Sequence, residues 1–215
     1  MKELYTIGHS NHSVETFVDL LLRHRVSAVA DVRSSPFSRF NPQYNRENLK
    51  PALLRAGIAY VYLGNALGPR SDDPACYENG RVSYERLAET PLFRAGLKRL
   101  REGAERQRIA IMCAEKDPIV CHRMILICRA LRSESIDIRH ILEDGSLESL
   151  EAAEKRLLVK LKMHQLSLFD RSVEDLFLRA YRKQAEKIAY RADDEDADQE
   201  EAEEEHTVWQ PVERP

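Results

Sequence analysis

The sequence lacks several features that would define its class at once. It has no run approaching the 18 or more apolar residues that a membrane-spanning helix needs. Its first residues lack the basic region and apolar core of a signal peptide, so we expect a cytoplasmic protein. It has only four cysteines, and no two have the CxxC spacing typical of a zinc ribbon. In a cytoplasmic protein we expect these thiols to be reduced and available for chemistry or metal binding.

Acidic and basic residues are unevenly distributed. Positions 193–205 contain ten acidic residues and no basic one. The chain up to residue 192 contains 32 basic and 25 acidic residues, an excess of seven positive charges. We therefore expect residues 192–215 to form a disordered acidic tail. The basic remainder suits an anionic partner such as nucleic acid.

Strand-like and helical runs alternate along the chain from residue 4 to about residue 161. Short apolar runs predict strands at 4–7, 28–32, 60–63, 109–112 and 136–141. Apolar residues at helical spacing predict helices at 14–24, 48–56, 92–105, 119–132 and 147–161. This alternation predicts an α/β domain over residues 1–162, with a mostly parallel sheet of about five strands and helices on both faces. A further helix, at 173–190, is expected in a C-terminal helical extension over 163–191.

Polar residues follow the predicted strands at their carboxyl ends, where parallel sheets bind ligands. The residues concerned are His9, Ser10, Asp31, Arg33, Cys113 and Glu115. We expect these side chains to meet at one edge of the sheet, and this convergence is the main argument from sequence for an enzyme.

The segment 113–123 combines two thiols, a carboxylate, an imidazole and a guanidinium. Its reactive residues are Cys113, Glu115, Cys121, His122 and Arg123. Asp117 and Pro118 are typical of the first residues of a helix. Cys121 would then lie in the first turn, where the helix dipole favours a thiolate. The turn after Cys113 resembles the cysteine loop of rhodaneses and low-molecular-weight phosphatases, but Ile119 stands where their pattern requires arginine.

These residues have predicted roles. We expect His9 and Glu115 to transfer protons, Asp31 to orient or activate a group, and Cys113 or Cys121 to act as nucleophile or to shape the site. Ser10, Arg33, His122 and Arg123 are predicted to bind substrate, the two arginines through phosphate.

Less reactive roles are also open for several of these residues. Ser10 and Ser13 are suited to cap a helix, and Asp31 and Arg33 are suited to form an ion pair at a strand end. The sequence requires no cofactor and assigns no metal ligand. A zinc site formed by Cys113, Cys121, His122 and His9 is an alternative, and it would make the protein a metal-dependent hydrolase.

Four segments taken together resemble the family catalogued as domain of unknown function 488. They are residues 6–10, 31–33, 62–68 and 113–123, and they occur in order within residues 3–142. The resemblance implies an α/β fold and a shared set of polar residues, and it implies no reaction. The family often has a further glycine after Gly68, where this chain has Pro69.

A second resemblance lies outside the predicted site. Gln165, Leu166, Leu168 and Phe169, with Ser167 between them, resemble the pentapeptide with which bacterial replication and repair proteins bind the DNA sliding clamp. Leu168 and Phe169 would fill an apolar pocket, and a Leu168→Ala/Phe169→Ala pair should then abolish clamp capture in a pull-down. Packing of these apolar residues within a helix is the other interpretation.

The sequence thus predicts an enzyme that acts on nucleic acid or on a nucleotide-like, phosphate-bearing substrate, in DNA repair or defence. A non-catalytic adaptor that binds nucleic acid or the clamp is the alternative.

Overall fold

The computed structural model describes residues 2–132, 134, 136–163 and 172–192. The clamp-like pentapeptide at 165–169 and the acidic residues after 192 lie outside this range. No helix in the described part of the chain has both the length and the apolar character that a membrane crossing demands.

Six strands form the central sheet, in the order β3-β2-β6-β1-β7-β8. They are β1 (Lys2–Gly8), β2 (Ala28–Asp31), β3 (Ala59–Tyr62), β6 (Ile109–Cys113), β7 (Ile136–Ile141) and β8 (Leu147–Ser149). Neighbouring strands are parallel except for β7 and β8, which are antiparallel. The predicted α/β fold and its five strands are confirmed. The sixth strand, β8, occupies the start of the predicted helix at 147–161, because that helix begins only after Ser149 caps it.

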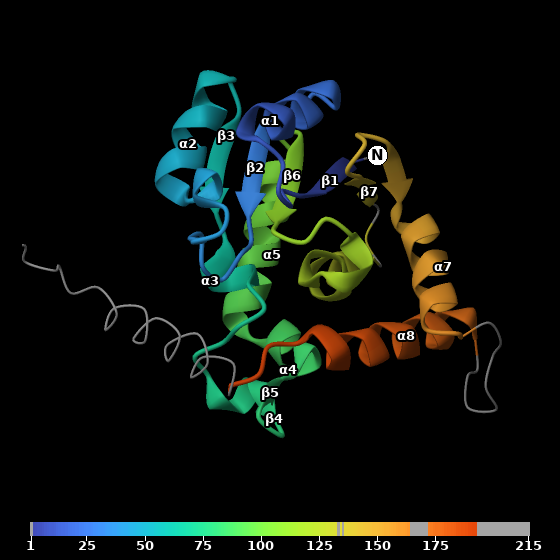
Figure 1. Ribbon diagram of the computed structural model, residues 1–215. Helices are drawn as coiled ribbons and strands as arrows, with labels where there is room; N and C mark the ends of the chain where they lie inside the picture. Colours follow the sequence, from blue (N-terminus) through green and yellow to red (C-terminus); the bar gives the residue numbers. More distant parts are fainter. Residues whose placement is uncertain (1, 133, 135, 164–171, 193–215) are drawn as a thin grey trace, which may run out of the picture.

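Helices cover both faces of the sheet, as predicted, so the sheet divides the hydrophobic core in two. The smaller core lies under α1 (Val14–Arg23) and α2 (Arg46–Arg55). The larger core lies under α5 (Pro91–Ala104), α7 (Leu150–Lys160) and α8 (Val173–Ile188). In Figure 1, α1 and α2 lie at one end of the molecule and α8 crosses the other end. The C-terminal helix therefore shares the larger core with the sheet.

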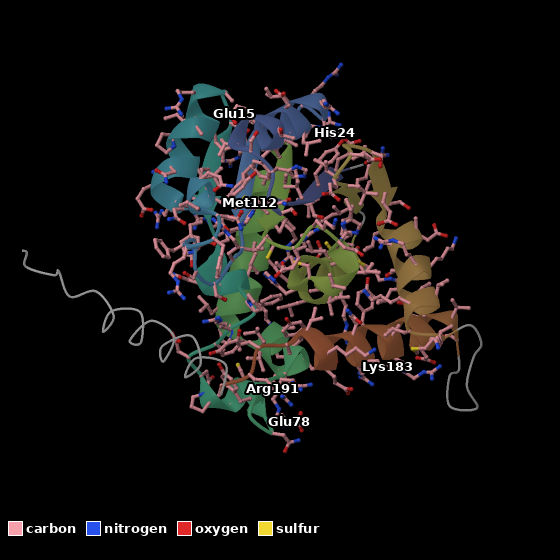
Figure 2. The ribbon with its side chains drawn as sticks, in the orientation of Figure 1. Glu15, His24, Glu78, Met112, Lys183 and Arg191 are labelled. Carbon is pink, nitrogen blue, oxygen red and sulfur yellow. The ribbon has the colours of Figure 1, made fainter. Side chains whose placement is uncertain are left out.

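Successive side chains of β6 point to opposite faces of the sheet and therefore enter different cores. Ile109, Ile111 and Cys113 belong to the larger core, whereas Ala110 and Met112 belong to the smaller one. Figure 2 labels Met112 near the middle of the molecule. The side chain of Cys113 consequently faces the segment that follows β6, on the side of the larger core.

The helix predicted over 119–132 is not one regular α-helix. A 3₁₀ turn (Pro118–Val120) is followed by a π-helix (Arg123–Cys128) and by the short α6 (Arg129–Leu131). The backbone of Cys121 is extended, with φ −127° and ψ 142°, so the helix cannot run through it. Cys121 and His122 thus stand between two helical segments, and π-helical turns are frequent at functional sites.

The long connection after β3 has secondary structure of its own. It contains α3 (Gly64–Leu67), a 3₁₀ turn (Pro74–Cys76), the hairpin of β4 (Tyr77–Glu78) and β5 (Arg81–Val82), and α4 (Tyr84–Glu89). The hairpin turns at Asn79 and Gly80, which both have positive φ, and an Asn-Gly pair is a strong sequence signal for such a turn.

The end of the described chain returns to this hairpin. The Val82 N–H donates to the carbonyl of Tyr190 at 3.0 Å, and the Ala192 N–H donates to that of Gly80 at 2.9 Å. Figure 2 shows Arg191 close to Glu78 at this end of the molecule. These bonds hold residues 190–192 beside β5.

Candidate active site

The carboxyl ends of β1 and β6 form a switch point in the sheet. These two strands are neighbours, but β1 leads through α1 to β2 and β6 leads through residues 114–135 to β7, in opposite directions. Crevices at such points are where open α/β sheets bind ligands. The polar residues predicted from the sequence do gather here, and they form two groups that face opposite sides of the sheet edge.

The first group, the thiol cluster, consists of Cys113, Glu115, Cys121 and His122. Glu115 Oε2 lies 3.0 Å from Cys113 Sγ and 2.9 Å from Cys121 Sγ. His122 Nδ1 lies 3.5 Å from Cys113 Sγ and 3.9 Å from Cys121 Sγ. The two thiols and the imidazole are buried, whereas Glu115 is exposed. One residue of the cluster is therefore accessible from solvent.

The two thiols of the cluster differ in acidity. Burial and the hydrogen bond with Cys121 raise the pKa of Cys113 well above its ordinary value. Burial alone would also raise the pKa of Cys121, but the hydrogen bond with Cys113, the Arg123 guanidinium and His122 together lower it well below that value. Glu115 is exposed as a whole residue, but its carboxylate lies against the two buried thiols. The loss of hydration there and the charge at Cys121 raise the pKa of Glu115. Cys121 is thus the sulfur that is favoured as a thiolate.

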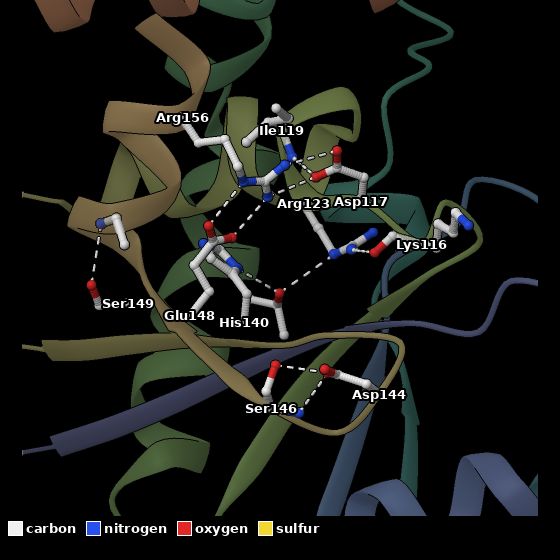
Figure 3. Close-up of polar contacts among 12 residues, drawn as sticks. Lys116, Asp117, Ile119, Arg123, His140, Asp144, Ser146, Glu148, Ser149 and Arg156 are labelled. Atoms are coloured by element: carbon white, nitrogen blue, oxygen red, sulfur yellow. Dashed lines mark hydrogen bonds and ion pairs between the residues drawn. The ribbon is translucent and has the colours of Figure 1, made fainter. Parts of the chain in front are cut away.

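Arg123 is buried beneath the thiol cluster and holds the loop that contains Glu115 in place. Its guanidinium donates to the carbonyl oxygen of Glu115 and, at 2.9 Å, to that of Lys116, and Figure 3 shows Arg123 beside Lys116. Its Nε donates to Thr6 Oγ1 at 3.4 Å. The residue is fully buried. It therefore has no surface with which to contact the phosphate expected from the sequence, and it instead fixes the backbone that presents Glu115.

The second group consists of His9, Asp31 and Arg33 with two tyrosines. Arg33 binds Asp31 through two bonds, of 2.9 Å from Nε and 2.7 Å from Nη2, and donates to the Tyr44 carbonyl at 2.9 Å. The Tyr60 hydroxyl donates to Asp31 at 2.7 Å. The structure thus contains the ion pair that the sequence left open as an alternative to phosphate binding.

His9 completes this second group. Its ring stacks on Tyr44 with centroids 4.0 Å apart, and its Nε2 lies 3.3 Å from Arg33 Nη1. Burial lowers the pKa of His9 to about 4, so its imidazole is neutral at pH 7. His9, Asp31 and Arg33 are all buried, and their catalytic or binding roles stay predictions.

His9 is also not placed to complete the alternative zinc site. It faces Tyr44, on the side of the smaller core, and Glu115 lies where a fourth donor beside Cys113, Cys121 and His122 would be needed.

Ser10 lies at the edge between the two groups. Its backbone N–H donates to the Ala114 carbonyl at 2.8 Å, and its φ of 49° is in the left-handed region. Ser13, and not Ser10, caps α1, since its hydroxyl accepts a hydrogen bond from the Thr16 N–H at 3.2 Å. Ser10 is therefore held in an uncommon conformation beside the loop that contains Glu115.

A cavity of about 420 Å³ adjoins the exposed side of the thiol cluster. Glu115 and His122 line it, together with Pro69, Tyr84, Val120, Ile188, Ala189 and Tyr190. Four basic residues also line it, namely Arg70, Arg81, Lys187 and Arg191. Arg70 lies over the Tyr190 ring at 4.1 Å, and the Arg81 guanidinium donates to the Glu186 carbonyl.

The sequence carries no signal that these four basic residues share one site. They form two pairs, Arg70 with Arg81 and Lys187 with Arg191, that are about a hundred positions apart along the chain. The pairing of residues 190–192 with the β4–β5 hairpin brings the two pairs together. The Asn79-Gly80 turn signal could have placed Arg81 at the start of a strand, but nothing in the sequence pairs that strand with residues 190–192.

Comparisons with known proteins agree with the resemblance described above. A search of curated proteins found no match, and neither did a search of solved structures. A family model described as domain of unknown function DUF488 matches residues 13–130. The match includes Asp31, Arg33 and the whole thiol cluster, whereas His9 and Ser10 precede it. Because it spans more than half of the 215 residues, the chain belongs to the DUF488 family.

Proposed function

We propose that this protein is an enzyme that acts on an anionic, phosphate-bearing substrate, either nucleic acid or a nucleotide-like molecule. The observation that supports the proposal most is the composition of the cavity. Glu115 and His122, two residues suited to chemistry, share its wall with Arg70, Arg81, Lys187 and Arg191.

Charge favours an anion in this cavity. One carboxylate faces four cationic side chains there, and basic groups within a concave site concentrate anions near it. The excess of seven positive charges in residues 1–192 acts in the same direction over a longer range. The volume of about 420 Å³ lies within the range of small-molecule sites and suits one nucleotide unit.

Glu115 is the group best placed to act on such a substrate. It is the exposed member of the thiol cluster, and Arg123 fixes the backbone that presents it. A carboxylate at this position can take a proton from an attacking water or hydroxyl, which fits a hydrolase or a group transferase.

Replacement of this carboxylate tests the proposal. We expect Glu115→Gln to lower turnover at least ~100-fold, as loss of a general base does. Turnover is measured on nucleoside triphosphates, single-stranded and duplex DNA, RNA and aryl phosphate esters. The matched control is Glu102→Gln, an exposed glutamate of α5 outside the cavity, which should keep full turnover.

Two outcomes of this experiment would contradict the proposal. Equal turnover in the Glu115→Gln variant and the original chain would remove Glu115 from the chemistry. If the chain binds the probes but turns over none of them, the non-catalytic adaptor becomes the better account.

Partner and location remain proposals of the sequence. A role in DNA repair or defence through the sliding clamp depends on Gln165, Leu166, Leu168 and Phe169, which lie outside the described residues. A cytoplasmic location is likewise a proposal from the sequence alone.

A further inference from the structure

The four donor atoms of the thiol cluster converge on one point. Cys113 Sγ, Cys121 Sγ, His122 Nδ1 and one Glu115 carboxylate oxygen all lie within 4.8 Å of one another. We propose that these four residues bind one thiophilic divalent cation of the zinc class. The inference rests on the donor geometry, and it deepens the proposed function by supplying the chemistry of the same cavity.

The distances suit a tetrahedral site. Zinc binds sulfur at about 2.3 Å and nitrogen or oxygen at about 2.0–2.2 Å, so neighbouring ligands in a tetrahedron are roughly 3.3–3.8 Å apart. The sulfur–nitrogen distances of 3.5 and 3.9 Å are close to this range. The sulfur–oxygen distances of 3.0 and 2.9 Å are slightly short, and Glu115, as the exposed ligand, has room to withdraw.

The orientation of His122 is that of a metal ligand. Its Nε2 lies 3.1 Å from the Val32 carbonyl oxygen, which can only accept a hydrogen bond, so Nε2 holds the hydrogen. In the neutral imidazole the lone pair is then on Nδ1, the atom that faces both sulfurs. Histidine ligands of metals commonly donate their other N–H to a carbonyl in this way.

The fold holds the four donors from three sides. The position of Cys113 at the end of β6 directs its sulfur toward the larger core, and the extended backbone at Cys121 brings the second sulfur back to it. Arg123 fixes the carbonyl of Glu115 from within the core. Donors that are supported by buried neighbours lose little freedom when they bind an ion, which favours binding.

The position of the thiol cluster, beside the cavity, favours a reactive metal site over a purely structural one. Structural zinc sites are usually closed sets of cysteine and histidine, whereas catalytic ones have three protein ligands and one exchangeable position. Here Cys113, Cys121 and His122 are buried, and Glu115 is exposed at the cavity. We assign Glu115 as the exchangeable ligand, and its carboxylate becomes free to take a proton, as proposed above, once water or substrate displaces it from the ion. A cation held there would polarise a phosphoryl oxygen of the substrate or lower the pKa of a bound water.

The experiment measures the metal directly in the full chain. Elemental analysis of protein purified without chelator should find about one zinc per chain, as four ligands around one ion require. After exchange for Co²⁺, the protein should show thiolate-to-cobalt charge-transfer absorption. Cys121→Ser and His122→Gln should weaken Co²⁺ binding at least ~100-fold, and Glu115→Gln should weaken it less, by roughly tenfold.

Matched controls come from the other two cysteines. Cys76 and Cys128 are buried free thiols outside the cluster, so Cys76→Ala and Cys128→Ala should keep the cobalt absorption. Circular dichroism of every variant checks that the fold is intact. The stoichiometry of the unaltered chain needs no variant, so the test stands even where a substitution prevents folding.

Three results would overturn the metal site. They are a chain that binds no Zn²⁺ or Co²⁺ at micromolar affinity, cobalt absorption that survives Cys121→Ser, or a Cys113–Cys121 disulfide in protein prepared under reducing conditions. A different result would contradict the proposed function, that of an enzyme acting on a phosphate-bearing substrate. A chain that holds the ion but neither binds nor turns over any phosphate-bearing probe keeps the metal site and loses the proposed function.

Discussion

At the scale of single residues, His140 shows how a buried group supports the site from a distance. Its Nδ1 lies 2.8 Å from the Thr6 hydroxyl, which also lies 3.4 Å from Arg123 Nε. Figure 3 shows His140 and Arg123 in this part of the core. Its Nε2 is buried and has no hydrogen-bond partner within the described chain. Burial, followed by the guanidinium groups of Arg123 and Arg156, lowers the pKa of His140 to about 3.

This low pKa predicts a pH dependence of stability. Below the unfolded pKa of about 6.5, the unfolded chain binds a proton at residue 140 that the folded chain does not bind, so stability falls as pH falls. We expect this group to cost roughly 3 kcal/mol of unfolding free energy by pH 4. His140→Asn, which keeps a partner for Thr6, should remove that share in urea unfolding measured from pH 7 to pH 4.

The pKa of His9 is also lowered, to about 4, so His9 contributes to the pH dependence that remains in the variant. An identical slope in the variant and the original chain would show that His140 is protonated without penalty in the folded state.

At the scale of the elements, the end of β1 decides how closely the loop with Glu115 can approach. A Cβ atom on Gly8 would lie 1.9 Å from the carbonyl oxygen of Glu115. The Ser10 N–H is bonded to the carbonyl of Ala114 on the same loop. Glycine is therefore required at position 8 because the backbone of the site passes directly against it.

The corresponding variant is Gly8→Ala. We expect it to displace the loop, to cost roughly 1–3 kcal/mol of stability through overpacking, and to weaken Co²⁺ binding at the thiol cluster. Gly103→Ala is the control, because it lies within α5 and its Cβ would meet only the end of the Ile109 side chain, at 2.9 Å. Similar behaviour of the two variants in unfolding and in cobalt titration would contradict this reading of Gly8.

Sequence patterns predicted the regular elements well and the irregular ones poorly. The five predicted strands are short apolar runs, and a run of that kind is determined mainly by its own residues. The π-helix after Cys121 was missed because it depends on an extended residue and on tertiary bonds from His122 and Arg123. The three-residue β8 was missed because it exists only through pairing with β7.

At the scale of the whole molecule, the C-terminal helix completes the site. Leu176, Ala180 and Tyr181 bury α8 in the larger core, and its end places Lys187 and Arg191 at the cavity. The polar residues at the strand ends were predictable from the sequence, because parallel strands share one edge. The basic side of the cavity was not, because it requires contacts between residues more than a hundred positions apart.

The most direct test of the account measures anion binding at this cavity. Lys187 and Lys183 are both exposed on α8, one turn apart, and only Lys187 lines the cavity. Fluorescence anisotropy with a labelled nucleotide and a labelled single-stranded oligonucleotide compares Lys187→Glu with Lys183→Glu at matched ionic strength. We predict that Lys187→Glu weakens binding at least ~5-fold and Lys183→Glu less than ~2-fold, because close charges act far more strongly than screened ones. Equal losses in the two variants, or no loss in either, would contradict the claim that this cavity is where the protein meets its substrate.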